Sequence, residues 1–169
     1  GGDEKECSLR IFRNSLWMIG ALILQSTYGE KLSFFDVRPD LVLLTLAYVA
    51  LSGGQIEGTL FGFLAGFLQD IYAPEQFGLN ALAKSIVGFA VGYGHGSIVI
   101  EHVWTRGLIL FGAVFGHDVL YFLFRDDWVS ILRTGLPTAL YTTLVGVGLS
   151  LLFFKATGRK IRGYAKKPF

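Results

Sequence analysis

The sequence predicts an all-α, polytopic integral membrane protein with about six transmembrane helices in one bundle. Its apolar residues are gathered into long runs joined by short polar breaks, most clearly at 107–124 and 137–154. A helix needs about 20 mostly apolar residues to cross a hydrocarbon core roughly 30 Å thick. The chain is 52% hydrophobic, with a mean hydropathy of +0.51. That is too apolar for a soluble domain of this size.

The 169 residues leave room for one domain. We expect a cytoplasmic N-terminal segment at 1–12, a helical bundle at 13–154 and a basic cytoplasmic tail at 155–169. Cys7 is the only cysteine, which excludes a disulfide framework within one chain, a thiolate metal cluster and a dithiol redox motif.

The first half of the bundle is predicted to hold three spans. The first covers about 15–28. The second, 41–51, follows an Arg-Pro-Asp sequence at 38–40, which favours a helix start because proline is tolerated in the first turn and Asp suits a helix N-terminus. This run is short, so we expect it to be tilted into a locally thin region or extended through the Ser-Gly-Gly at 52–54. The third span covers about 56–72.

The second half is predicted to hold three more spans. They cover about 79–93, from 104–107 to 124, and 137–154, the last one after a break at Thr134-Gly135. Between the last two, 125–133 mixes Trp128 and aliphatic residues with charges. This pattern is typical of a short helix lying along the membrane surface, with the Trp at headgroup level.

Lys and Arg counts predict the orientation, because cytoplasmic flanks are enriched in both residues. One side of the bundle, with both termini, holds most of them: Lys5, Arg10, Arg13, Arg106, Lys155, Arg159, Lys160, Arg162, Lys166 and Lys167. The other side holds fewer: Lys31, Arg38, Arg125 and Arg133. We therefore expect both termini in the cytoplasm. The basic tail fits a stop-transfer signal, and an anionic-lipid or phosphate site is the alternative.

Glycines recur at every fourth position. They lie at Gly54, Gly58, Gly62 and Gly66, at Gly88 and Gly92, and at Gly112 and Gly116. In lipid, small residues at i and i+4 permit close van der Waals contact between helices. The pattern predicts packing faces, against helices of the same chain or against a partner.

Ionisable residues at membrane depth usually face the protein interior or water, because they are costly in hydrocarbon. Asp70, Lys84 and Asp118 are predicted to lie in the outer half of the bundle. Polar residues expected near them are Gln69, Asn80 and His117. One interpretation is a proton- or ligand-binding cluster. The favoured one is a buried Asp70–Lys84 pair, with Asp118 as a further member, that fixes the relative position of three helices.

The sequence offers no convincing active site. His95 and His102 lie with Glu101 in the connection 94–106, and two histidines seven residues apart in a glycine-containing loop form a poor metal site because no third ligand is evident. His117 and Asp118 are neighbours, whose side chains leave a helix about 100° apart, so we expect them not to act as a dyad. We predict no catalytic residue, no metal and no cofactor.

The chain resembles the rod shape-determining protein MreD family in an ordered set of motifs. These are Pro39-Asp40-Leu41 opening a span, the sequence at 62–70 ending in Asp70, the sequence at 77–82 and the sequence at 88–93. Carried over by position, the motif residues are Pro39, Asp40, Asp70, Gly78, Leu79 and Asn80. The later spans agree in hydropathy and number. Gln69 and Lys84 depart from the pattern, because apolar residues are expected there.

The resemblance implies a non-enzymatic scaffold of the bacterial elongation machinery, in the inner membrane, that helps organise lateral peptidoglycan synthesis. Its expected partner is MreC, through the transmembrane or membrane-proximal segment. MreB, RodA and its penicillin-binding transpeptidase are further candidates, beside the lipid bilayer, and no nucleic acid is expected.

The architecture is also similar to that of the substrate-binding S subunits of energy-coupling-factor vitamin transporters, so vitamin binding is the alternative function. The small-residue docking face on the first helix of such subunits is absent or altered here, where Gly20-Ala21 are followed by bulky residues at i+4. An enzyme acting on lipid-linked intermediates would need a convergent polar site that the sequence does not offer.

Overall fold

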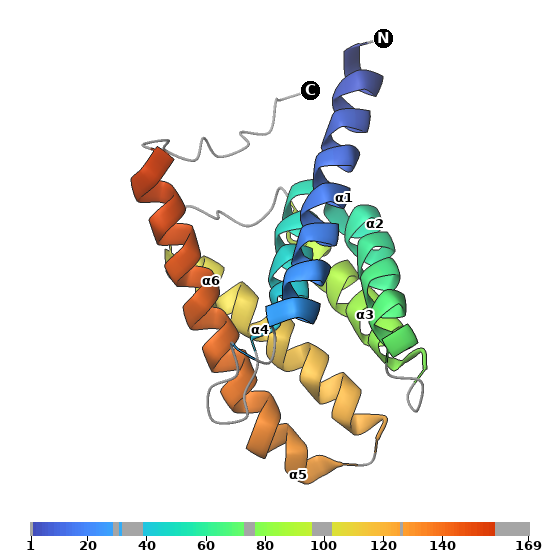
Figure 1. Cartoon of the computed structure of the whole chain (residues 1–169), viewed down its shortest axis with the longest axis vertical. Coiled ribbons are helices and arrows are strands. Elements are labelled where there is room, and N and C mark those ends of the chain that lie inside the picture. Colours follow the sequence, from blue (N-terminus) through green and yellow to red (C-terminus); the bar gives the residue numbers. More distant parts are fainter. Residues whose placement is uncertain are drawn as a thin grey trace.

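The structure, a computed structural model, describes residues 2–28, 31, 39–72, 77–95, 103–125 and 127–157 (Figure 1). Its elements are α1 (Gly2–Tyr28), α2 (Leu41–Tyr72), α3 (Leu79–Tyr93), α4 (Val103–Leu123), α5 (Trp128–Ser130), η2 (Ile131–Gly135) and α6 (Leu136–Thr157). Every regular element of this part is helical, which confirms the all-α prediction. Arg38, Glu101, His102 and the tail from 158 onward lie outside the described residues.

Helix α1 begins well before the predicted span at 15–28. Residues 3–13 mix charged helix formers such as Glu, Lys and Arg with apolar residues. They continue the transmembrane helix as a helical extension. Hydropathy finds the part of a helix that suits lipid, and it does not find where the helix begins.

The element α2 is a helical hairpin, with its reversal at Gly54. This residue has φ 87° and ψ −170°, a conformation that glycine adopts without steric cost. A Cβ on Gly58 would lie 2.8 Å from the Cβ of Ala50, although a straight helix would separate the two by about 12 Å. Val42 and Ala65 likewise share one hydrophobic cluster. The limbs 41–53 and 55–72 therefore run antiparallel, which confirms the two predicted spans.

Helix α3 packs backbone against backbone on the second limb of α2. A Cβ added at Gly58, Gly62 or Gly66 would come closer than 3.0 Å to a main-chain carbonyl oxygen of α3. A Cβ at Gly88 would collide with the carbonyl of Gly58 in the same way, and one at Gly92 would meet the main chain at residues 54 and 55. The long glycine stripe is therefore an intramolecular packing face.

Between α4 and α6, the short helix α5 continues through η2 into α6 without a break. Asp127 caps α5 by accepting hydrogen bonds from the Ser130 N–H (3.2 Å) and the Ser130 hydroxyl (2.6 Å). Trp128 is 60% exposed, as a headgroup-level side chain would be. The predicted break at 134–135 is wrong, because the π-helical turn η2 leads directly into α6. Pro137, which has no N–H to donate, follows this π-helical turn.

The helices form two groups. The first holds α1, α2 and α3, and the second holds α4 and α6 with η2. The start of α1 and the end of α6 lie at the same end of the bundle, and α5 lies at the opposite end (Figure 1). The groups meet where α4 contacts α3 and α2.

The described helices have the composition of membrane spans. Glu4–Tyr28 is long and apolar enough to cross a membrane, and Leu41–Tyr72 has the same composition, although its reversal divides it into two shorter limbs. Leu79–Tyr93 and Gly107–Leu123 are shorter apolar helices. Large apolar side chains such as Leu108 and Leu144 point outward rather than into a core. The fold is an all-α helical bundle of the membrane type.

Candidate functional site: a polar junction and an open groove

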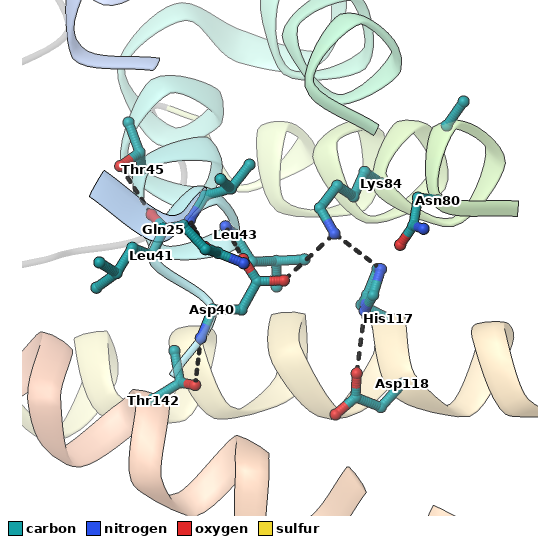
Figure 2. Close-up of polar contacts among 12 residues, drawn as sticks. Gln25, Asp40, Leu41, Leu43, Thr45, Asn80, Lys84, His117, Asp118 and Thr142 are labelled. Atoms are coloured by element: carbon teal, nitrogen blue, oxygen red, sulfur yellow. Dashed lines mark hydrogen bonds and ion pairs between the residues drawn. The ribbon is translucent and has the colours of Figure 1, made fainter. Parts of the chain in front are cut away.

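A buried ionic cluster lies where the two helix groups meet, and we call it the polar junction: Asp40, Lys84, His117, Asp118 and Thr142 (Figure 2). Lys84 on α3 is its centre and is only 1% exposed. Its Nζ donates to Asp40 Oδ2 at 3.3 Å and lies 3.0 Å from His117 Nε2 on α4. Lys84 thus connects the start of α2 with α4.

His117 continues the chain of contacts, because its Nδ1 lies 3.0 Å from Asp118 Oδ1. A lysine ammonium can only donate, so Nε2 must accept and the Nδ1–H must donate to Asp118. The predicted separation of these neighbours is therefore wrong. A 100° angle between side chains leaves their Cβ atoms close enough for two short, polar side chains to meet.

Asp40 links the junction to the remaining helices. Its Oδ1 accepts from the Leu43 N–H at 2.8 Å, as an N-terminal cap of α2. Its main-chain N–H donates to Thr142 Oγ1 on α6 at 3.1 Å. Gln25 on α1 accepts from the Val42 N–H at 3.0 Å beside it. The sequence marked Asp40 as a helix start, and its role as the partner of Lys84 was missed.

The predicted Asp70–Lys84 pair is wrong. Asp70 is fully buried at the end of α2 and caps the N-terminus of α3. Its Oδ1 accepts from the main-chain N–H (3.1 Å) and side-chain amide (3.0 Å) of Asn80, and its Oδ2 accepts from the N–H groups of Gly78 and Ala81, both at 3.0 Å. Both oxygens are fully used at this helix end, and Lys84 lies one turn farther along α3.

The remaining predicted residues of this region support the α2–α3 connection. Gly78 holds φ 96°, which requires glycine in practice, and Leu79 begins α3. Pro39 is buried beside Asp40. The Gln69 side-chain oxygen is buried without a hydrogen-bond partner among the described residues, so Gln69 does not join the junction.

A second polar cluster, absent from the predictions, lies beside the reversal of α2 at Gly54. Arg10 donates to Glu57 Oε1 at 2.6 Å, and the fully buried Asn14 contacts Glu57 Oε2 at 3.4 Å. His95 reaches over Gly54 to the Leu51 carbonyl at 2.7 Å. A glutamate inside a glycine stripe was the available signal, because a charge on a packing face needs a partner.

An open apolar groove of about 410 Å³ runs between α3 and α4. We call it the α3–α4 groove, and its lining is Ile86, Val87, Ala90, Val91, Ile109, Gly112, Ala113, Gly116 and Leu120. A Cβ added at Gly112 or Gly116 would meet no atom within 4 Å. This glycine pair is not used for packing within the chain, in contrast to the long stripe.

The described residues hold no group of three or more His, Cys, Asp or Glu side chains that could bind a metal ion. The polar junction holds the helices together through charge and hydrogen bonding. The α3–α4 groove is a surface of small residues suited to packing against another helix.

The apolar helices, the buried ionic junction and the glycine packing faces define an α-helical membrane protein. The family model of the rod shape-determining protein MreD matches residues 9–158, and the chain belongs to this family. No curated protein and no solved structure matches the chain. MreD proteins are membrane proteins that determine cell shape, so membership implies a role in rod-shape determination.

Proposed function

We propose that this protein is a non-enzymatic scaffold of the cell-elongation machinery that binds MreC and helps to organise lateral peptidoglycan synthesis. Contacts with MreB, or with RodA and its transpeptidase, would follow from that assembly. The family match supports the cellular process, and the α3–α4 groove supports a mode of binding.

The groove is the observation that carries the proposal. Helices associate in lipid through close packing at small residues. Gly112 and Gly116 lie one turn apart on α4 and are open, whereas the stripe at 58–66 is already covered by α3. A single transmembrane helix of the partner, laid into the groove, would approach the α4 backbone at these two positions.

We further propose that the protein is a multi-pass protein of the bacterial inner membrane with both termini in the cytoplasm. The excess of Lys and Arg on the side of the termini supports this orientation. The start of α1 and the end of α6 lie at one end of the bundle, as an even number of spans requires (Figure 1).

The test is co-purification of MreC with groove variants in a mild detergent. Gly112→Leu and Gly116→Leu should fold, because a Cβ at either position meets no atom within 4 Å, and should lose MreC by filling the groove. Gly148→Leu on α6 is the matched control, since its Cβ also meets no atom within 4 Å. Equal MreC recovery with all three variants would refute the groove as the binding site. Mass spectrometry of the same sample would reveal a vitamin-like ligand if the transporter alternative held.

A further inference from the structure

We propose that the polar junction is a proton-binding site that controls how closely α4 packs on α3. The inference concerns the chain's own helices and does not depend on the partner. It rests on the direction of each hydrogen bond in the buried chain from Asp40 to Asp118 (Figure 2).

The Nε2 lone pair of His117 has two possible users. It now accepts a hydrogen bond from Lys84 Nζ at 3.0 Å. A proton taken from water would bond to the same lone pair, because Nδ1 already carries its hydrogen toward Asp118. A proton and Lys84 therefore compete for one atom, and the Lys84–His117 contact cannot survive proton uptake.

The charges of the junction show where it would come apart. With His117 neutral, two carboxylates face one ammonium, and the ring connects them. With His117 protonated, the cluster divides into two neutral pairs: Lys84 with Asp40, between α3 and α2, and His117 with Asp118, both on α4. The separation falls between the two helix groups, along the interface that contains the α3–α4 groove.

Lys84 is the cation whose Nζ contacts the His117 ring nitrogen, at 3.0 Å. The groups that face His117 or its partners are Asp40 from the start of α2, Lys84 from α3, Asp118 and Tyr121 from α4, Gly135 from η2 and Thr142 from α6. Tyr121 stacks on the His117 ring with 6.0 Å between the ring centroids, and the Arg125 guanidinium lies 5.7 Å from the centroid of the Tyr121 ring.

The test is a distance measurement between α3 and α4 by electron paramagnetic resonance. Spin labels at Leu82 on α3 and Leu123 on α4, 44% and 39% exposed, would be placed in a Cys7→Ser background in lipid nanodiscs. We expect a reversible shift to longer distance as the pH falls from 8 to 4. An unchanged distance would overturn the proposal.

His117→Gln is the matched control, because its amide can still accept from Lys84 and donate toward Asp118 but cannot titrate. We expect its distance to be independent of pH, and a shift equal to that of the unsubstituted protein would also overturn the proposal. A second measurement needs no folded variant: ¹⁵N NMR of the histidine rings at pH 8 should find His117 as the Nδ1–H tautomer. An Nε2–H tautomer or an imidazolium at that pH would refute the proton competition.

Discussion

Removal of the Asp70 carboxylate should be among the most damaging single changes in this protein. Asp70→Ala leaves the N–H groups of Gly78, Asn80 and Ala81 and the Asn80 amide without their acceptor. The Ala81 N–H is buried, and an unsatisfied buried donor costs about 1–3 kcal/mol. The others are partly buried, so water replaces part of each bond and about 1 kcal/mol apiece is lost. We expect the free energy of unfolding to fall by about 4–6 kcal/mol.

The variant Asp70→Asn tests the geometry more sharply than Asp70→Ala. Each carboxylate oxygen accepts two hydrogen bonds, so an amide in either orientation turns an NH₂ group toward two N–H donors. Asn should therefore be nearly as destabilising as Ala. The neighbouring Gln69→Met is the control, and we expect it to be close to neutral because the Gln69 oxygen has no partner among the described residues. The assay is reversible unfolding in mixed micelles followed by circular dichroism. Asp70→Asn within about 0.5 kcal/mol of the unsubstituted protein would refute this capping role.

Further predictions concern packing, charge and the surface helix. Gly62→Leu should destabilise the fold by more than about 3 kcal/mol, because its side chain meets main-chain atoms of α3, whereas Gly148→Leu should not; equal thermal stability of the two would contradict the packing. Lys84→Met should lower the free energy of unfolding by about 3–5 kcal/mol in the same micelle assay, since it leaves the Asp40 carboxylate without its cation. An unchanged free energy of unfolding would show that the ion pair does not stabilise the fold. Hydrogen bonds from Ser130 hold the pKa of Asp127 below its usual value. The α5 cap should therefore persist as the pH falls and be lost only below the ordinary aspartate range. In a variant with Trp128 as its only tryptophan, the fluorescence should change in that acidic pH range. Asp127→Ala in the same variant should give, already at neutral pH, the fluorescence that the parent shows in acid.

Much of the fold could be predicted from the sequence, because hydropathy identifies the segments of each helix that suit a lipid environment. Two separate spans were predicted at 41–51 and 56–72, and the glycine spacing predicted a packing face without identifying α3 as the helix that covers it. The start of α1 and the continuous α5–α6 connection were missed. Both involve charged or mixed residues whose helical state depends on local hydrogen bonding, which hydropathy does not measure.

Three members of the polar junction, Lys84, His117 and Asp118, were predicted, whereas Asp40, Thr142 and the pairing of the charges were missed. Depth in the membrane placed Lys84, His117 and Asp118 together, and it also placed Asp70 with them. Which carboxylate pairs with the Lys84 ammonium depends on how each helix is rotated and on which carboxylate oxygens already accept hydrogen bonds. Asp70 is fully occupied by the α3 terminus, so Lys84 pairs instead with Asp40, a residue that lies on the other limb of α2.

Site-specific photo-cross-linking in living cells tests the central claim, that a partner helix lies in the α3–α4 groove, most directly. A photoreactive side chain at Ile109, which lines the groove, should capture MreC, identified by mass spectrometry. The same probe at Leu144, 72% exposed on α6, should capture little or none of it. Cross-linking of MreC at Leu144 and not at Ile109 would contradict the claim.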